Sequence, residues 1–338
     1  MPKAGNKQLG NAKKAKKDEF YTQLCDIERE LRHYEHHFKG KTVLCNCDDP
    51  RVSNFFHYFS YKFEDLGLKR LITTCYKNQE RDLFSQNNSE RAIWLEYLGD
   101  KNGNRVPDPE EIGIRYFNGD GDFRSDECIE LLKQADIVVT NPPFSLFIEY
   151  IRQLVRYEKK FLVIGPQNAI HYKDTFELIK ANKIWLGYGF TAGNAFFSIP
   201  KENIREFANG VYDPDKGLVK FRNCTWFTNL DHEKRHEEYV FIRKYRPDDY
   251  PKYTNFNAID VSKSADIPED WHGLMGVPDT FLEKYNPDQF EIVGLGSGDL
   301  AKQIGVKKNY RGRTDVAYRI DGKDKCPYSR IIIRRRTK

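Results

Sequence analysis

The sequence predicts an α/β fold: a doubly wound sheet formed by most of the chain, followed by a smaller C-terminal region. Two observations carry this prediction. Through the first 245 residues, short apolar runs rich in β-branched residues alternate with segments of helical periodicity, which is typical of strands joined by helices. From residue 246 onwards, prolines and glycines interrupt the chain at short intervals, and it becomes loop-rich.

The individual elements follow from these patterns. Runs of strand character lie at residues 42–47, 71–76, 137–141, 161–165, 184–188, 195–199 and 224–228. Helical segments are expected at residues 24–34, from residue 55, and at residues 127–134 and 146–155. The turn-rich stretch 99–104 separates two apolar runs, which predicts a hairpin within an insertion that spans residues 79–117.

The strand at residues 137–139 ends in an abrupt corner. Its β-branched run is expected of a central strand in a parallel sheet. Pro142 cannot donate to a sheet ladder and pushes Asn141 away from helical conformation, so the strand ends at Thr140 or Asn141. Ligands bind outside the carboxyl ends of strands in open α/β sheets. Residues 141–144 are therefore the first candidate site.

The chemistry of this corner suits an exocyclic amine on a flat ring. The side-chain oxygen of Asn141 and the carbonyl of Pro142 can accept the two protons of such an amine and free its lone pair for attack. Pro143 fixes a second backbone angle, and Phe144 offers a face on which an extruded base can stack, worth ~1–3 kcal/mol per base. The alternative is a plain strand terminator followed by a core phenylalanine.

The corner also resembles a known motif. Asn-Pro-Pro-Phe after a hydrophobic strand is similar to the catalytic motif of amino-methyltransferases that use S-adenosylmethionine, and asparagine at its first position resembles the adenine-N6 branch. Further stretches resemble the EcoRI-type modification methylases, in order and from about Asp18 to the C-terminus: DEFYTQL, CNCDDPRVSNFFHYF, GDGDFRSDE, TNPPFSLF, WFTNLDH and MGVPDTFLEKYNPDQFEIVG.

That resemblance implies both fold and activity. It implies a seven-stranded methyltransferase sheet with a reversed last strand and a smaller C-terminal DNA-recognition region. It also implies site-specific methylation of adenine N6 in double-stranded DNA, on a base flipped out of the duplex. The expected setting is a type II restriction–modification system with a palindromic site such as GAATTC. A cognate restriction endonuclease would act on that site without forming a stable complex.

The resemblance also marks residues that would bind S-adenosylmethionine. They are Tyr21, Thr22, Asp48, Asp49, Pro50, Asn54, Asp122 and Phe123. Acidic residues suit a cofactor that carries an ammonium and a sulfonium, although the glycine-rich turn of most methyltransferases is absent. Asp122 is expected to accept a hydrogen bond from the adenine amine of the cofactor, and Phe123 to pack on that ring. Phe196 and Trp226 are further candidates for base stacking, and no metal is expected.

The charge distribution is strongly uneven. The chain of 338 residues has a net charge of +5, but residues 1–17 carry +6 and residues 301–338 carry +10, which leaves −11 for residues 18–300. Dense basic ends are typical of nucleic-acid binding. The candidates for phosphate contacts are Lys13, Lys14, Lys16, Lys17, Arg334, Arg335 and Arg336. The alternative for the lysines is a solvated tail, and the alternative for the arginines is a strand that closes a sheet edge.

These observations predict three regions. They are a disordered basic tail at residues 1–17, a catalytic domain at 18–245 and a DNA-binding region at 246–338. Seven scattered cysteines without a C-x-x-C pair fit reduced thiols in a cytoplasm. The rival interpretations are a methyltransferase that acts on RNA or on protein glutamine, and an inactive DNA-binding protein on the same fold.

Overall fold

The computed structural model describes residues 21–47, 53–76, 92–104, 107–108, 110–190, 193–198 and 211–336. The chain divides into two compact units. The first contains residues 1–169 and 186–231, and the second contains residues 170–185 and 232–338. Within the described ranges, no helix has both the length and the apolar character needed to cross a membrane. The assignment of DNA recognition to residues 246–338 stays a prediction.

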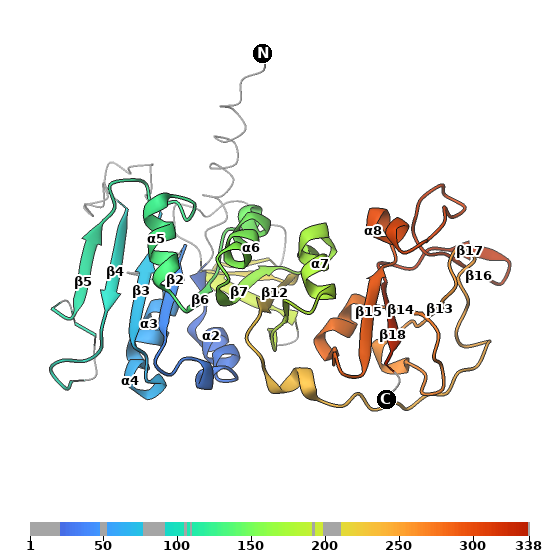
Figure 1. Ribbon diagram of the computed structural model, residues 1–338, viewed down its shortest axis with the longest axis horizontal. Coiled ribbons are helices and arrows are strands. Elements are labelled where there is room, and N and C mark those ends of the chain that lie inside the picture. Colours follow the sequence, from blue (N-terminus) through green and yellow to red (C-terminus); the bar gives the residue numbers. More distant parts are fainter. Residues whose placement is uncertain are drawn as a thin grey trace, which may run out of the picture. The chain divides into compact units, whose positions relative to one another are not determined.

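A mixed sheet forms the centre of the first unit and confirms the predicted α/β fold (Figure 1). Its strand order is β5-β4-β3-β2-β6-β7-β12-β8. The bounds are β2 (Thr42–Asn46), β3 (Arg70–Thr74), β4 (Ile93–Tyr97), β5 (Ile112–Tyr116), β6 (Ile137–Thr140), β7 (Lys160–Pro166), β8 (Trp185–Leu186) and β12 (Cys224–Thr228). Strands β3, β2, β6 and β7 are parallel, so their carboxyl ends meet at one edge of the sheet.

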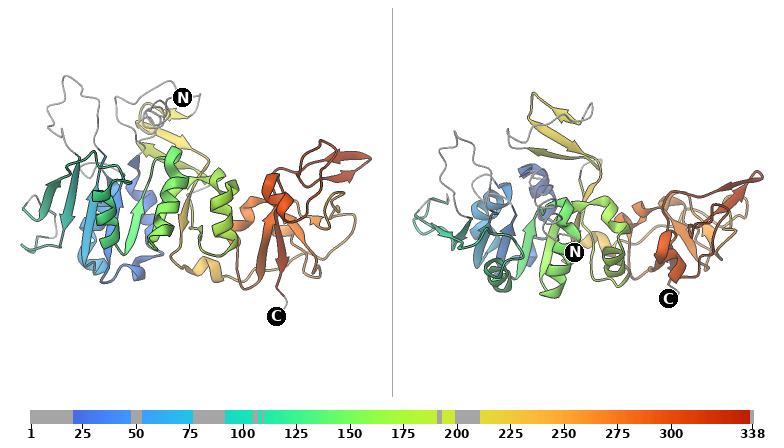
Figure 2. Two further views of the ribbon diagram at one scale, coloured as in Figure 1. Left: turned by 45° about the horizontal axis from the view of Figure 1, so that its top comes forward. Right: turned by 90° about the horizontal axis from the view of Figure 1, so that it is seen from above.

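Helices cover both faces of this sheet. They are α2 (Leu24–Leu31), α3 (Asn54–Tyr61), α4 (Phe63–Leu66), α5 (Asp126–Gln134) and α6 (Phe147–Arg156). Successive strand residues point to opposite faces, and Val43 and Cys45 of β2 pack in one apolar cluster with Ile27 of α2 and Phe59 of α3. Seen from above, α5 and α6 lie on the opposite face (Figure 2).

The number of strands differs from the expected seven. The part of the chain that the structure describes contributes eight strands to the sheet. The predicted hairpin is present as β4 and β5, and β4 pairs antiparallel with β3, so the hairpin extends one edge. The reversed strand that the resemblance implied is β12, which pairs antiparallel with β7.

A second, antiparallel sheet belongs to the same unit. Its order is β1-β9-β11-β10, with β1 (Tyr21–Thr22), β9 (Ala195–Ser198), β10 (Tyr212–Asp213) and β11 (Leu218–Phe221). The strand predicted at residues 195–199 therefore lies outside the main sheet. Its residues alternate between buried and exposed positions, as expected of a sheet with one face toward the core.

The second unit is built on a four-stranded sheet of order β13-β14-β18-β15. Its elements are α7 (Lys173–Lys180), β13 (Ile259–Asp260), β14 (Met275–Val277), β15 (Phe290–Leu295), α8 (Gly298–Gln303), β16 (Tyr318–Ile320), β17 (Lys323–Lys325) and β18 (Ile331–Arg335). Strands β16 and β17 form a separate hairpin. Strand β18 pairs with both β14 and β15, so the C-terminal strand is internal and does not close an edge.

Candidate active site

The corner after β6 is buried at its first two residues, and its two prolines restrict the backbone. Asn141 is 7% exposed, and Pro142 is also buried. Pro143 is extended, with φ −54° and ψ 126°, and its carbonyl accepts a hydrogen bond from the backbone N–H of Leu146 at 2.9 Å. No residue in the described ranges donates a hydrogen bond to the carbonyl of Pro142. That carbonyl oxygen therefore retains its capacity to accept a proton from a ligand.

The end of β2 is tied to this corner by hydrogen bonds. The hydroxyl of Thr140, the residue before the corner, donates to the backbone carbonyl of Asn46. The hydroxyl of Tyr150 in α6 donates to the side-chain oxygen of Asn46. Complete burial raises the pKa of Tyr150 well above its usual value, so this hydroxyl stays protonated and remains a donor. Hydrogen bonds thus join the carboxyl ends of β2 and β6 to each other and to α6.

An acidic loop at residues 119–123 lies beside the end of β3. Gly121 has φ +74°, and a side chain there would collide with the carbonyl oxygen of Cys75. Only glycine lets the loop pack this closely. The pKa of Tyr76, which follows β3, is raised mainly by burial and further by the nearby carboxylates of Asp120 and Asp122. The loop therefore places two carboxylates, of which that of Asp122 is paired with Arg124, beside the carboxyl end of β3.

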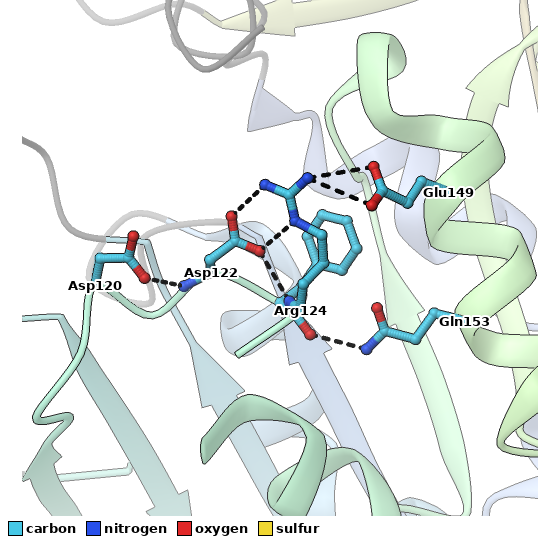
Figure 3. A network of polar contacts seen from close by, with 6 residues as sticks. Asp120, Asp122, Arg124, Glu149 and Gln153 are labelled. Atoms are coloured by element: carbon cyan, nitrogen blue, oxygen red, sulfur yellow. Dashed lines mark hydrogen bonds and ion pairs between the residues drawn. The ribbon is translucent and has the colours of Figure 1, made fainter. Parts of the chain in front are cut away.

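Asp122 is held by Arg124 (Figure 3). Its Oδ1 accepts from the backbone N–H and Nε of Arg124, both at 2.8 Å, and its Oδ2 accepts from Nη2 at 2.6 Å. Burial opposes ionisation of Asp122, but the bonds from Arg124 outweigh it and lower the pKa of the carboxyl. A carboxylate has about four acceptor positions. Three are used by Arg124, so one on Oδ2 is left for a ligand amine.

Helix α6 anchors the rest of this loop. The backbone carbonyl of Phe123 accepts a hydrogen bond from Nε2 of Gln153 at 2.8 Å, and Glu149 contacts the guanidinium of Arg124 at 3.3 Å (Figure 3). The ring of Phe123 packs against that of Tyr150, with 5.1 Å between centroids. Because Tyr150 also bonds Asn46, a continuous chain of contacts joins the predicted cofactor residues to the predicted catalytic corner.

The structure also brings together two cofactor candidates, one that precedes β2 in the sequence and one that follows it. Nδ2 of Asn54 donates to the backbone carbonyl of Thr22 at 2.7 Å. Tyr21 and Thr22 form β1, which pairs with β9. The hydroxyl of Thr22 is buried and has no hydrogen-bond partner among the described residues. A buried hydroxyl in this state is suited to a ligand. The candidates Asp48, Asp49 and Pro50 lie outside the described residues.

The aromatic candidates differ in exposure. Phe144 is half-buried and meets the edge of Phe221 at 6.2 Å. Phe196 is 38% exposed, and the ammonium of Lys220 lies 5.7 Å from its ring centroid. Trp226 has no exposed surface and stacks on Phe190 in the core. The expectation that Trp226 stacks a base is therefore corrected, since neither face of its ring is accessible.

The basic candidates have two outcomes. Lys13, Lys14, Lys16 and Lys17 lie outside the described residues. The three C-terminal arginines have partners within the second unit: Arg334 pairs with Glu291 at 2.7 Å, Arg335 donates to the carbonyl of Glu269, and Arg336 donates to that of Pro287 at 2.8 Å. Their contact with DNA stays a prediction. The described ranges contain no group of three or more His, Cys, Asp or Glu side chains arranged to hold a metal ion.

Sequence reasoning missed the residues that support the site. Asn46 ends a strand that was predicted correctly, and its position beside Thr140 follows from the parallel register of β2 and β6. Tyr150 and Gln153 are three residues apart on one helix and so share a face, which was a usable signal. Arg124 follows Phe123 directly, but its bidentate grip on Asp122 depends on the loop conformation.

Comparisons with known proteins show which family the chain resembles. The family described as "Adenine-specific methyltransferase EcoRI" matches residues 8–336 of the chain. The "Type II methyltransferase M.EcoRI" of Escherichia coli is 47% identical over 98% of this chain and 97% of its own length. The "Type II methyltransferase M.MgeORF184P" of Mycoplasma genitalium is 39% identical, over 97% of this chain and 98% of its own length. No solved structure matches the chain.

Proposed function

Because the chain belongs to the adenine-specific EcoRI methyltransferase family, we propose that it transfers a methyl group from S-adenosylmethionine to N6 of an adenine flipped out of duplex DNA. One observation carries the proposal for this chain. The corner at residues 141–144 and the acidic loop at residues 119–123 are joined through Asn46 and Tyr150 at the carboxyl ends of the parallel strands.

The residues of the corner would bind and orient the base. The side-chain oxygen of Asn141 and the carbonyl of Pro142 accept the two N6 protons, which directs the nitrogen lone pair away from the ring plane. Pro143 keeps the backbone extended, and Phe144 stacks the extruded ring. Catalysis then rests on holding the amine in line with the methyl donor. The cost of unstacking the base is met by these contacts.

The residues present fit S-adenosylmethionine. Asp122 keeps one acceptor position for the adenine amine of the cofactor, and the buried hydroxyl of Thr22 is available for a hydrogen bond. Tyr21, Asn54 and Phe123 complete the set within the described residues, and Asp48, Asp49 and Pro50 are assigned from the resemblance alone. When bound, the cofactor supplies the methyl group from its sulfonium.

The restriction–modification setting is proposed from the same family membership. The chain would be the modification enzyme of a type II restriction–modification system, at a palindromic site such as GAATTC. A restriction endonuclease would cut the same site when it is unmodified. Residues 246–338 would form the region that recognises DNA, with Arg334, Arg335 and Arg336 and the basic tail near the phosphates.

Sequencing genomic DNA from cells that express the protein tests this proposal. Modified adenine should appear at one short sequence and should be absent from cells that express Asn141→Ala. Parallel assays with labelled cofactor on duplex DNA, RNA and protein address the rival substrates. Label that enters RNA or protein but not DNA would refute the proposal, and so would a complete lack of transfer by the wild-type enzyme.

Asp122→Ala should weaken binding of S-adenosylmethionine. Loss of a hydrogen bond to a charged group costs about 1.5–3 kcal/mol, or roughly 10- to 150-fold in the dissociation constant. Because the pKa of Asp122 is lowered, the carboxylate stays ionised at neutral pH, and its contribution is lost only as the pH falls through that low pKa. Calorimetry measures the affinity. Glu130→Ala, which removes an exposed carboxylate of α5 that pairs with Lys133, is the matched control and should bind the cofactor normally.

Deletion of residues 1–17 should weaken binding to cognate and non-cognate duplexes by similar factors. Each phosphate contact contributes about −0.9 to the slope of log affinity against log salt concentration, and phosphate contacts do not read bases. Titrations of both duplexes at several salt concentrations measure this slope. An unchanged slope would mean that the six lysines of the tail are only solvated, and a loss confined to the cognate site would mean that the tail reads sequence.

A further inference from the structure

A strongly basic loop lies in the second unit at residues 306–314. It carries Lys307, Lys308, Arg311 and Arg313 and has no acidic residue. All four side chains are exposed. None of them forms an ion pair with another residue in the described part of the chain. Within the described residues, the positive charge of this loop is therefore not neutralised by an ion pair.

Other arginines of the same unit are engaged internally. Arg330 pairs with the buried Asp260 at 2.8 Å, and Arg334 pairs with Glu291 at 2.7 Å. The guanidinium of Arg335 lies 4.2 Å from the ring centroid of Phe241. A cation already held by a carboxylate or a ring has less to gain from a phosphate. The cations of the loop are therefore more available to a phosphate than Arg330, Arg334 and Arg335 are.

The loop is built around one buried asparagine. The side-chain oxygen of Asn309 accepts from the backbone N–H of Arg311 at 2.8 Å and of Arg313 at 3.3 Å, and its Nδ2 donates to the carbonyl of Asp315 at 3.0 Å. The backbone N–H of Asn309 donates to the carbonyl of Arg313 at 2.8 Å. Gly312 has φ +72°, which closes the turn.

A second asparagine clamps the base of the loop. Nδ2 of Asn255 donates to the carbonyls of Lys307 at 2.7 Å and Asp315 at 2.8 Å, and its Oδ1 accepts from the N–H of Ala317 at 2.8 Å. Both ends of the loop are thus fixed by side chains that are 9% exposed. A backbone held in this way loses little conformational entropy when a ligand binds its exposed cations.

We propose that the loop at residues 306–314 binds the phosphate backbone of the duplex that carries the target site. The inference rests on the proposed function, which makes duplex DNA the substrate. Lys308, Arg311 and Arg313 would supply the contacts, and Tyr310, which is 49% exposed and lies under the guanidinium of Arg311 at 5.1 Å, keeps that side chain extended over a flat surface. DNA suits this loop because its charges are closely and regularly spaced, about one per 1.7 Å of duplex.

A charge-matched pair of triple variants tests the proposal. The test variant is Lys308→Gln/Arg311→Gln/Arg313→Gln, which keeps the backbone bonds to Asn309. The control removes equal charge from exposed lysines elsewhere in the unit: Lys244→Gln/Lys263→Gln/Lys284→Gln. Both are titrated with a cognate and a mixed-sequence duplex at several salt concentrations. Cofactor affinity and methylation at saturating DNA are measured alongside.

The test variant should lose about 0.9 from the salt slope for each contact removed, which corresponds to roughly eightfold in affinity per contact at about 0.1 M salt. Both duplexes should be affected alike, while cofactor binding and turnover at saturating DNA persist. Three results would overturn the proposal: wild-type behaviour of the test variant, an equal loss in the control, or a loss confined to the cognate duplex. If the wild-type enzyme methylates no DNA, it is the proposed function that fails. If the wild-type enzyme binds and methylates DNA and the test variant does so equally well, only the proposal about the loop fails.

Discussion

Replacement of Asn141 by alanine should lower kcat by at least ~10²-fold, the scale of losing one preorganised polar contact in a transition state. The side-chain oxygen of Asn141 is one of two acceptors proposed for the target amine. Without it the nitrogen lone pair stays conjugated with the ring. Binding of duplex DNA should persist, because that affinity comes largely from phosphate contacts. Single-turnover methylation of an oligonucleotide duplex measures the chemical step apart from product release.

Two controls keep this result interpretable. Asn141 is 7% exposed, so its truncation also removes packing, and a thermal melt must show that the variant is folded. Ser145→Ala changes an exposed residue of the same turn and should leave kcat near the wild-type value. Methylation by Asn141→Ala at a near-normal rate would remove the corner from the catalytic assignment.

Asp260→Ala should destabilise the second unit by about 3–5 kcal/mol, the usual cost of leaving one partner of a buried ion pair alone. The carboxylate of Asp260 is completely buried, and the side chain of its partner Arg330 is 11% exposed. The hydroxyl of Tyr253 donates to the same carboxylate at 2.6 Å. Truncation would leave the buried guanidinium of Arg330 and the buried hydroxyl of Tyr253 without the carboxylate that they both bind. Thermal or urea unfolding, followed by circular dichroism, measures the loss.

The exposed pair of the same sheet supplies the matched control. Arg334 and Glu291 keep 53% and 40% of their side-chain surface exposed, so Glu291→Ala should cost no more than about 1 kcal/mol. Equal losses from Asp260→Ala and Glu291→Ala would contradict the view that burial decides the strength of these pairs. Because the two substitutions remove the same charge, net charge cannot explain a difference between them.

Local rules made the corner predictable from sequence. Proline fixes φ and removes a donor whatever surrounds it, so the end of β6 and the position of Asn141 followed from neighbouring residues alone. The α/β alternation likewise predicted the parallel strands. The hairpin of β4 and β5 was also predicted, but seven strands were expected where the described residues form eight, since pairing at a sheet edge depends on residues far apart in sequence.

Side-chain environments were harder to predict than elements. Phe196 and Phe197 are adjacent in β9, yet the first is 38% exposed and the second is fully buried, and the sequence of the strand does not say which face is covered. Trp226 is equally ambiguous for the same reason. The density of arginines at the C-terminus suggested free charge, but the partner Glu291 of Arg334 lies 43 residues earlier in the chain, where no local pattern announces it.

Helix α6 begins directly after the corner and carries three side chains that fix the other half of the site: Glu149 on Arg124, Tyr150 on Asn46 and Gln153 on Phe123. One helix therefore contacts both the proposed base subsite and the proposed cofactor subsite. Any ligand that displaces α6 changes the free energy of binding at the other subsite, and such an effect is reciprocal by thermodynamic necessity. If the two proposed subsites bind as described, occupancy by the methyl donor and capture of the extruded base would be linked equilibria, coupled through the contacts of Glu149, Tyr150 and Gln153.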